Sequence, residues 1–278
     1  MNYGPDSNTK KTIKTPFSWF GGKSKSLSWL LPILENVDHQ TFVDVFGGSG
    51  TVLWNKNPSP VDVYNDIYMD VVNFFRQLRE KPDELLRLLH LTPYSRTEFE
   101  LSLNQNEDAN LEKARKFFVI ARQVTRGLAT QPSPGRWCFV KNHSRRGMAL
   151  VVSRWLSGVD YLETLVERLK TTTVENLDWR KLFTKYDSET TLFYLDPPYP
   201  EEVRPGGRAY AREFIHADHQ ELLERVKQLS GKVVLSSYDN KLYNEHLGEW
   251  RTQTEKEKVI GNCNFHNKRT QQEKVWIK

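Results

Sequence analysis

Residues 191–200 of this chain, Thr-Leu-Phe-Tyr-Leu-Asp-Pro-Pro-Tyr-Pro, constrain its fold more strongly than any other stretch. The apolar run before Asp196 predicts a short buried strand. Pro197 and Pro198 must end that strand, because proline neither donates to a sheet ladder nor continues a helix. The result is a stiff elbow that holds the Asp196 carboxylate and the Tyr199 ring at the carboxyl end of a strand. Open α/β sheets bind their ligands at that end.

The groups at this elbow suit an exocyclic amino group on a nucleobase. The Asp196 carboxylate and the Pro197 carbonyl can accept its two N–H donors and draw the lone pair back onto the nitrogen. Tyr199 can stack on the base, which is worth roughly 1–3 kcal/mol. A plain Asp-Pro-Pro turn with a buried tyrosine is the alternative, and a glycine loop upstream argues against it.

This glycine loop follows a β-prone run within residues 41–54. Its Gly-Gly-Ser-Gly sequence lets a ligand approach the backbone closely. A dinucleotide-binding pattern fails because Leu53 stands where its third glycine belongs, and no Gly-Lys-Ser/Thr follows for a phosphate-binding P-loop. The remaining motif, Asp44-x-Phe46-x-Gly48-x-Gly50, predicts a site for a nucleoside-bearing cofactor without a pyrophosphate.

Acidic residues follow two further predicted strands. The strand at residues 61–64 leads to Asp66, which is placed to bind the two hydroxyls of a ribose. Ile67 can then pack on an adenine ring. The strand at residues 172–177 leads to Asp178, on the same edge of the predicted sheet. The ligand edge therefore carries an acid after each of these strands.

Near the N-terminus, residues 16–25 form a predicted turn around Gly-Gly-Lys. A helix follows with leucines at helical spacing. Trp19 offers a stacking face at this turn and Lys23 a positive charge, whereas a plain loop before a helix cap is the simpler interpretation. By itself this pattern is a weak signal.

Strands that alternate with helices predict an α/β fold with a doubly wound, mostly parallel sheet. The alternation stops between residues 72 and 169, where helical patterns at 85–89 and 111–124 predict a mainly helical insertion. It resumes with a helix at 216–230 and a strand at 232–237. The segments 251–260 and 273–278 predict a closing antiparallel pair. The length of 278 residues suits one large domain, or one domain with such an insertion.

The insertion contains a basic stretch interleaved with aromatic residues. Trp137 and Phe139 alternate with polar residues within a turn-rich sequence, which is typical of a short hairpin or loop facing a phosphate backbone. A solvated basic loop is the alternative. The candidate DNA-binding residues are Arg122, Arg126, Arg136, Lys141, Arg145 and Arg146.

Composition adds bounds to these patterns. The net charge of +5 permits a polyanionic partner without proving one. No apolar run approaches the length of a membrane span, and the N-terminus lacks the apolar core of a signal peptide. The two cysteines, Cys138 and Cys263, form no CxxC pair, which suits a reducing cytoplasm. We therefore expect a cytoplasmic protein without a membrane partner.

Taken in order, these motifs resemble the Dam-like, D12 class of N6-adenine DNA methyltransferases. The resemblance covers nearly the whole chain and implies a seven-stranded Rossmann-like methyltransferase sheet. It implies a catalytic domain made of residues 1–71 and 170–278, with an inserted target recognition domain at residues 72–169. It implies the following contacts to S-adenosyl-L-methionine: Trp19, Lys23, Asp44, Phe46, Gly48, Gly50, Asp66, Ile67, Asp178 and Asp196.

The resemblance also implies catalytic residues and a reaction. The catalytic motif corresponds to Asp196, Pro197, Pro198 and Tyr199, while Tyr210 and Phe214 resemble an aromatic pair downstream of it. The methyl group would pass directly from the cofactor to N6 of an adenine flipped out of double-stranded DNA. The expected DNA partner is therefore a duplex. A homodimer and a cognate restriction enzyme are left open as further partners.

Metal and covalent chemistry find little support in the sequence. His216 with His219, and Cys263 with His266, have ligand-like spacing, but no second close pair completes a zinc signature. Cytosine C5 methylation uses a Pro-Cys nucleophile, whereas each cysteine here follows another residue type. We expect a reaction without a metal.

Two other functions stay open at this stage. A cytosine N4-methyltransferase would bind an amino group with the same hydrogens, although such enzymes usually carry Ser-Pro-Pro-Tyr, so Asp196 favours adenine. A DNA-binding module without activity is the alternative from another class. The intact Asp66, Asp196 and Tyr199 argue against it, and a cofactor-binding assay would separate the two.

Overall fold

The computed structural model describes residues 15–104, 109–125, 129–203, 213–255, 258–260 and 269–278. Its centre is a seven-stranded sheet with the order β5-β2-β1-β6-β7-β11-β8. The bounds of these strands are β1 Thr41–Asp44, β2 Val61–Asn65, β5 Thr172–Glu175, β6 Thr191–Leu195, β7 Lys232–Tyr238, β8 Arg251–Thr254 and β11 Glu273–Ile277. The pairs among β5, β2, β1, β6 and β7 are parallel, and β11 runs antiparallel to both of its neighbours. The predicted mostly parallel, seven-stranded sheet is confirmed.

The strand order reverses between β1 and β6. After β1 the chain continues to β2 on one side, whereas β6 joins β1 on the other side, with Val43 opposite both Val63 and Phe193. Loops that leave the carboxyl ends of such strands diverge and open a crevice. The glycine loop follows β1 and the Asp-Pro-Pro-Tyr elbow follows β6. The topology therefore brings the two strongest sequence motifs to one crevice.

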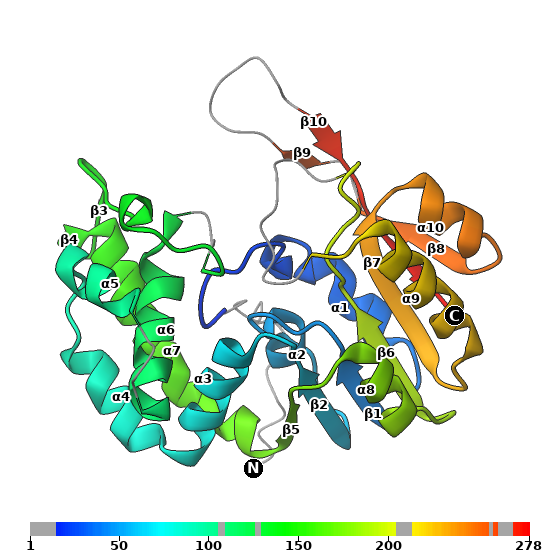
Figure 1. Cartoon of the computed structure of the whole chain (residues 1–278), viewed down its shortest axis with the longest axis horizontal. Helices are drawn as coiled ribbons and strands as arrows, with labels where there is room; N and C mark the ends of the chain where they lie inside the picture. The colour runs from blue at the N-terminus through cyan, green and yellow to red at the C-terminus, as the bar shows by residue number, and fades with distance from the viewer. Residues whose placement is uncertain (1–14, 105–108, 126–128, 204–212, 256–257, 261–268) are drawn as a thin grey trace, which may run out of the picture.

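Helices cover both faces of the sheet (Figure 1). One face packs against α1 (Leu27–Glu35), α2 (Thr51–Asn55) and α3 (Met69–Glu80), and the other against α8 (Trp179–Tyr186), α9 (His216–Gln228) and α10 (Lys241–His246). Alternate strand residues separate the two cores. Phe42 and Tyr194 point to the first, while Val43 and Phe193 point to the second. This alternation produces the two layers of helices that a doubly wound sheet requires.

The predicted helical insertion forms a group beside the sheet, at the left of Figure 1. Its elements are α4 (Pro82–Leu91), α5 (Arg96–Ser102), α6 (Asn110–Gln123), the short 3₁₀ helix η3 (Pro134–Arg136), the hairpin β3 (Ser144–Arg145) and β4 (Met148–Ala149), and α7 (Leu150–Lys170). Phe118 stacks on Phe74 of α3 at 5.3 Å and contacts Trp155 of α7. This aromatic packing is continuous with the core of the first sheet face. The helices at 85–89 and 111–124 are confirmed, while the division into domains stays a prediction.

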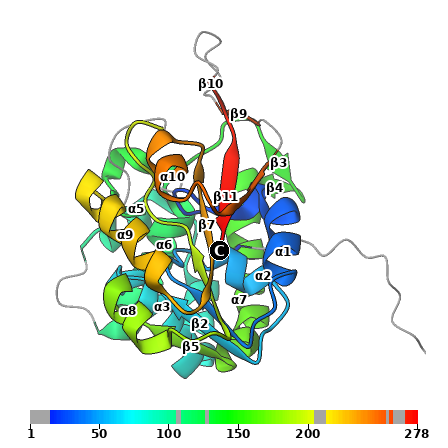
Figure 2. The ribbon, with the colours of Figure 1, turned by 90° about the vertical axis from the view of Figure 1, so that its right-hand side faces the viewer.

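The C-terminal strands differ in part from the prediction. β8 pairs with β11 as expected, but β9 (Lys258–Ile260) pairs with β10 (Arg269–Gln271) outside the main sheet. From Thr254 in β8 to Lys258 in β9 the chain advances by four residues, whereas from Gln271 in β10 to Lys274 in β11 it advances by three. The pairing of the two segments therefore shifts by one residue. The ribbon β9–β10 and the hairpin β3–β4 lie at the same end of the molecule in both ribbon views (Figure 2).

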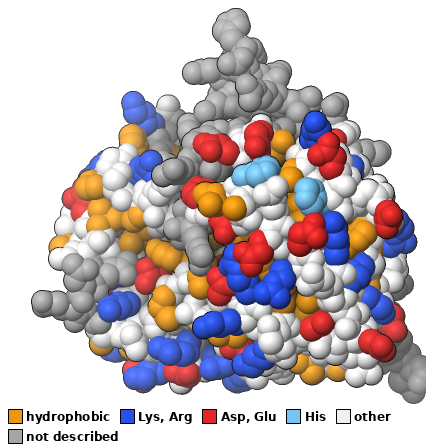
Figure 3. Space-filling model, turned by 45° about the vertical axis from the view of Figure 1, so that its right-hand side comes forward, with side chains coloured by type: hydrophobic (Ala, Val, Ile, Leu, Met, Phe, Trp, Pro, Cys, Tyr) orange, Lys and Arg blue, Asp and Glu red, His pale blue; other side chains and the backbone are white. Residues whose placement is uncertain are grey.

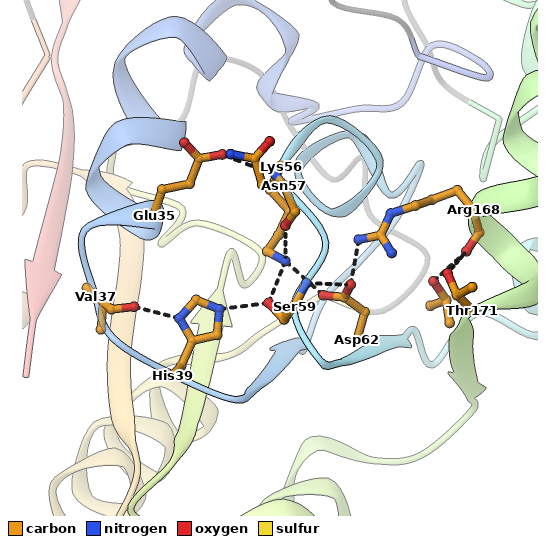
Figure 4. Close-up of polar contacts among 10 residues, drawn as sticks. Glu35, Val37, His39, Lys56, Asn57, Ser59, Asp62, Arg168 and Thr171 are labelled. Atoms are coloured by element: carbon orange, nitrogen blue, oxygen red, sulfur yellow. Dashed lines mark hydrogen bonds and ion pairs between the residues drawn. The ribbon is translucent and has the colours of Figure 1, made fainter. Parts of the chain in front are cut away.

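A buried ion cluster lies at the opposite, amino end of β2 (Figure 4). We call Lys56, Asp62 and Arg168 the amino-end cluster. The two oxygens of Asp62 accept from Lys56 at 2.8 Å and from Arg168 at 2.6 Å, and the backbone N–H of Ser59 adds a third bond at 3.1 Å. Because Arg168 belongs to α7, this cluster fastens the end of the long helix to the sheet. Among the helices described, none is long and apolar enough to cross a membrane.

Candidate active site

A pocket of about 980 Å³, including the solvent at its mouth, lies at the carboxyl ends of β1, β2 and β6. It brings together residues that are far apart in the sequence. The predicted cofactor residues that line it are Trp19, Lys23, Asp44, Phe46, Gly48, Asp66, Ile67, Asp178 and Asp196. Gly50 does not line the pocket and instead precedes α2 with a left-handed backbone (φ 67°). The pocket thus contains the predicted cofactor set with one exception.

The glycine loop fits tightly between aromatic rings. Gly48 has φ 51°, and a Cβ on it would lie 2.6 Å from the indole of Trp19. The hydroxyl of Tyr64 donates to the Gly48 carbonyl at 2.6 Å. Only glycine combines this backbone conformation with this close contact. The backbone of Gly48 therefore packs directly against the Trp19 indole at the pocket.

Asp66 holds this loop in place. Its two oxygens accept from the backbone N–H groups of Gly48 at 2.7 Å and Tyr68 at 2.8 Å. Burial raises the pKa of Asp66, although these backbone hydrogen bonds oppose the rise. The backbone N–H of Ile67 is a third donor, and a carboxylate offers about four lone-pair sites in total. Asp66 can therefore support the loop and still accept from a ligand hydroxyl.

Asn65 joins the ends of three strands beside Asp66. Its amide donates to the carbonyls of Val45 at 2.9 Å and Leu177 at 3.1 Å, and its oxygen accepts from the Leu177 N–H at 2.9 Å. The loops after β1 and β5 are thereby tied to β2. The sequence prediction placed no function on Asn65, whose buried amide at a strand end was the available signal.

Asp178 has a structural partner in addition to its place in the pocket. It caps α8 by accepting from the backbone N–H of Arg180 at 3.0 Å, and it forms an ion pair with the Arg180 guanidinium at 3.2 Å. Arg180 also pairs with Glu221 of α9. Helix capping thus accounts for an acid at this position. Contact of Asp178 with a cofactor stays a prediction.

Lys23 connects two carboxylates at the mouth of β6. Its ammonium lies 2.5 Å from Asp196 Oδ1 and 3.4 Å from Glu273 Oε1. We call Lys23, Asp196 and Glu273 the catalytic-edge cluster. Ser236 of β7 donates a further hydrogen bond to Asp196 Oδ1 at 3.1 Å. Among the described residues both of these contacts fall on Oδ1, so Oδ2 stays available to a ligand.

A third carboxyl, Asp44, lies behind this cluster at the end of β1. It is 2% exposed. Burial, followed by repulsion from Asp196 and Asp66, raises the pKa of Asp44 well above its usual range. Burial and the neighbouring carboxylates therefore disfavour ionisation of Asp44 relative to an exposed aspartate.

Pro198 lines the pocket with Asp196, whereas Pro197 and Tyr199 do not. The Tyr199 ring is buried, and its hydroxyl donates to Glu273. The Tyr238 ring packs edge-on against it at 4.9 Å, and the Lys23 ammonium lies 4.8 Å from its centre. In this arrangement Tyr199 supports the site from behind. Stacking of Tyr199 on a substrate base stays a prediction.

The basic hairpin has the geometry that the sequence indicated. Lys141, Arg145 and Arg146 are exposed on or beside β3–β4. The turn residues Arg146 and Gly147 both have positive φ, 56° and 73°, which is the backbone of a tight two-residue hairpin turn. The Trp137 ring stacks on the exposed Phe139 at 6.1 Å. Exposed cations on a rigid turn are suited to phosphate contacts.

Arg136 and Arg122 differ from this pattern. Arg136 donates to the carbonyl of Gln131 at 2.6 Å. Arg122 packs against Gly158 of α7 and donates to the carbonyls of Pro16 and Arg154. Burial lowers the pKa of Arg122 to about 10. Its guanidinium is used between helices, so the prediction of a DNA-facing Arg122 does not fit this packing.

Several predicted residues lie outside the described part of the chain: Arg126, Tyr210, Cys263 and His266. Phe214 is described; it lines the pocket and meets the Phe46 ring edge-on at 5.5 Å. His219 is buried and bonds the Tyr243 hydroxyl at 2.9 Å. Within the described residues, no group of three or more His, Cys, Asp or Glu side chains is arranged to hold a metal ion.

Sequence reasoning missed Glu273 and Ser236, both of which contact the catalytic motif. Glu273 begins a strand in which Val275 and Ile277 share its side, so the pattern placed an acid at an inward position. That mismatch was the available signal for Glu273. Ser236 lies inside a buried strand and carried no such signal.

The face that α9 and α10 occupy carries basic and acidic side chains side by side (Figure 3). The Arg180–Glu221 ion pair and the Lys227–Glu224 pair of α9 are examples of this mixing. The exposed hairpin cations lie elsewhere, at the end of the molecule that the ribbon β9–β10 shares.

The sheet order and the crevice at its reversal define a Rossmann-like methyltransferase fold. A family model, the D12 class N6 adenine-specific DNA methyltransferases, matches residues 19–260. The chain belongs to this family, which transfers methyl groups to N6 of adenine in DNA. Family membership implies an S-adenosylmethionine-type donor and a DNA substrate.

Two characterised relatives agree with this assignment. The chain is 27% identical over 242 residues to the type II methyltransferase M1.LlaDCHI of Lactococcus lactis subsp. cremoris, covering 81% of this chain and 80% of that protein. It is also 35% identical over 106 residues to the modification methylase StsI of Streptococcus sanguinis. That second match covers 38% of this chain and 15% of StsI, so it concerns a small part of the larger protein.

Proposed function

We propose that this chain transfers a methyl group from S-adenosyl-L-methionine to N6 of adenine at a specific site in double-stranded DNA. The observation that carries the proposal is that the glycine loop, Asp66 and the Asp196 carboxylate line the same pocket. Asp196 also has one oxygen to which the described residues contribute no hydrogen bond. An adenine amino group entering the pocket would find this acceptor beside the cofactor site.

The residues of the pocket fit the cofactor chemically. Asp66 can still accept from a ribose hydroxyl, and Ile67, 42% exposed at the rim, offers an apolar surface to an adenine ring. The Trp19 indole, with Lys23 nearby, lies at the end where the methionine part would bind. The bound cofactor would supply a sulfonium methyl group that is already activated for transfer. The protein then needs to orient the reacting atoms and exclude water.

The substrate amino group would be held by Asp196 and the Pro197 carbonyl. As a bond forms between N6 and the methyl carbon, the N–H groups become more acidic, so hydrogen bonds to these acceptors strengthen in the transition state. The cofactor would supply the methyl group and leave as a neutral thioether, and the proton released from N6 would pass by way of the Asp196 carboxylate to solvent. Lys23 fixes the orientation of the Asp196 carboxylate through Oδ1.

DNA would bind at the end of the molecule where the basic hairpin lies. Lys141, Arg145 and Arg146 would contact phosphates, and residues 72–169 would serve as the target recognition domain. Neutralised phosphates release counterions, so such contacts weaken as salt rises. Arg122 is omitted from this proposed surface because of its packing between helices.

The experiment that tests the proposal is expression in a host without DNA methylation, followed by mass spectrometry of the digested DNA. We expect N6-methyladenine, and sequencing for modified bases would identify the recognition site. N4-methylcytosine instead would establish the cytosine alternative. Unmodified DNA together with tight duplex binding and no cofactor binding by calorimetry would establish an inactive DNA-binding module.

The remaining partners are part of the same proposal. The name of the Lactococcus relative, a type II methyltransferase, supports a cognate restriction enzyme for this chain. Protection of the host DNA from an endonuclease encoded nearby would test that partner. Sedimentation of the purified chain, alone and with a duplex, would distinguish a homodimer from a monomer. A cytoplasmic location follows from the DNA substrate and would be tested by fractionation.

A further inference from the structure

Glu273 is an acidic residue at a buried strand position that an apolar side chain usually occupies. It is the first residue of β11 and lies opposite Tyr238 of β7 in the antiparallel register. Its residue surface is 9% exposed. A carboxyl group at such a position is costly unless partners compensate it. The compensation comes from two groups of the catalytic site, namely the Tyr199 hydroxyl and the Lys23 ammonium.

These two partners meet on one oxygen. Tyr199 donates to Glu273 Oε1, and the Lys23 ammonium lies 3.4 Å from the same atom. Lys23 is closer to Asp196, at 2.5 Å. One ammonium is therefore shared by two carboxyl groups, and it cannot neutralise both. When both carboxyl groups are ionised, the three groups together carry one net negative charge.

We infer that Glu273 is a positioning residue for methyl transfer. It holds the Tyr199 ring through the tyrosine hydroxyl, and its negative charge offsets part of the attraction between Lys23 and Asp196. The inference rests on the proposed function. Its physical basis is that an Asp196 carboxylate fully neutralised by Lys23 would be a weak acceptor for an amino group. With Glu273 present, Asp196 keeps more of its negative charge for the substrate.

The groups that face Glu273 come from several elements. Lys23 lies on the 3₁₀ helix η1 (Lys23–Lys25), Asp196 and Tyr199 follow β6, and Tyr238 belongs to β7. Burial, with repulsion from Asp196, raises the pKa of Glu273, while Lys23 and the Tyr199 hydroxyl oppose that rise. Tyr194 of β6 also senses its charge. Loss of this charge should therefore alter how the site titrates.

The test compares Glu273→Gln with the wild-type protein in single-turnover methylation of a duplex. The amide keeps the size and an acceptor for Tyr199 but removes the charge. We expect the transfer rate to fall about tenfold, because Lys23 then neutralises Asp196 more fully and Asp196 becomes a weaker acceptor. We also expect the acid limb of the pH–rate profile to move to lower pH, because the remaining carboxylate would face Lys23 without a competing negative charge. Cofactor affinity by calorimetry should stay within about twofold.

Glu255→Gln is the matched control. Glu255 is also a buried acid, its backbone N–H donates to the Glu273 carbonyl at 2.8 Å, and its carboxylate accepts from Ser26 at 2.9 Å. We expect this control to keep the wild-type acid limb, whatever its effect on the melting temperature. A purely structural role for Glu273 would lower the melting temperature in both variants and leave the acid limb unmoved, which would overturn the inference.

Tyr199→Phe separates the two parts of the inference. If Glu273 acts partly through the Tyr199 hydroxyl, then Glu273→Gln should slow the Tyr199→Phe protein less than it slows the wild type. Fully independent effects would overturn the anchoring role. A wild-type rate and acid limb in Glu273→Gln would overturn the whole inference while leaving the proposed function intact. Absence of N6-methyladenine with the wild-type protein would overturn both.

Discussion

The two buried ion clusters at opposite ends of the sheet differ in charge balance. In the amino-end cluster, one carboxylate, Asp62, is 1% exposed and meets the two cations of Lys56 and Arg168. In the catalytic-edge cluster, one cation, Lys23, meets two carboxyl groups, and Asp196 is 17% exposed. In the first cluster both oxygens of the single carboxylate are bonded within the protein, although the Nε of Arg168 is buried without a hydrogen-bond partner among the described residues. The second keeps an acceptor for something else.

The charge balance of the two clusters distinguishes a buried charge that stabilises the fold from one that can bind a ligand. Burial lowers the pKa of Lys56, and the hydrogen bond and attraction of Asp62 counteract that effect. Its ammonium also donates to Asn57 and Ser59. Such a cluster, with both oxygens of its carboxylate bonded to cations, stabilises one arrangement of β2 and α7. A cluster with excess negative charge beside a pocket is instead poised to interact with a ligand.

We expect the largest effect from breaking the amino-end cluster, and we expect it on the free energy of unfolding. Asp62→Ala leaves two buried cations without their carboxylate, so we expect the free energy of unfolding to fall by about 3–5 kcal/mol. Urea titration would measure it. The transfer rate per folded molecule should stay near that of the wild type. A large loss of rate in the folded fraction would show that the two clusters are coupled through the sheet.

Breaking the catalytic-edge cluster should lower the transfer rate rather than the stability. Asp196→Ala removes an acceptor that strengthens as N6 is methylated, and we expect the single-turnover rate to fall by roughly 100-fold or more. Duplex binding should persist, because the basic hairpin lies apart from the pocket. Asp196→Asn, which keeps the shape, is the control for packing. Full activity in Asp196→Ala would contradict the mechanism.

The glycine loop lines the pocket but belongs to neither ion cluster, so a change in it should affect ligand binding. Gly48→Ala would place a methyl group against the Trp19 indole on a left-handed backbone, and we expect cofactor affinity to fall about tenfold or more. Gly147→Ala is the matched control, since its φ is also positive (73°) but its Cβ would meet nothing within 4 Å. Calorimetry of both variants measures the difference. Equal affinities would show that the loop does not approach the cofactor.

The smallest effect should come from the hairpin, which belongs to neither cluster. Arg145→Ala should lower the slope of log affinity for duplex against log salt by about one unit, without changing stability or cofactor affinity. Lys227→Ala, which removes the partner of Glu224 on α9, is the control and should leave the slope unchanged. An unchanged slope for both would place the DNA surface elsewhere.

Local signals predicted the parts of the site that depend on backbone geometry. The double proline after Asp196 and the glycines after Asp44 restrict φ and ψ directly, so the positions of these strand ends followed from the sequence. Topology then placed both motifs in one crevice. The local pattern did not indicate that the Arg122 guanidinium packs against Gly158 of α7, because that contact joins two helices.

Long-range contacts were beyond such reasoning. The burial of Tyr199 depends on Glu273, which lies 74 residues further along the chain. The departure of β9 from the sheet likewise depends on how its partner β10 is registered. Neither the partner of a buried hydroxyl nor the register of a ribbon is written in the local pattern, because both depend on which surfaces the folded core brings together.

The order of the motifs therefore predicted the family and the class of fold, because glycine, proline and strand patterning act over a few residues. Nine of the ten residues predicted to bind the cofactor also line one pocket. Only the tertiary structure decided how the charges are shared. Lys23 lies 173 residues from Asp196 in the chain, yet the two form the closest ion pair of the catalytic-edge cluster. Packing decides such pairings because a buried charge must take the partners that the fold places within reach.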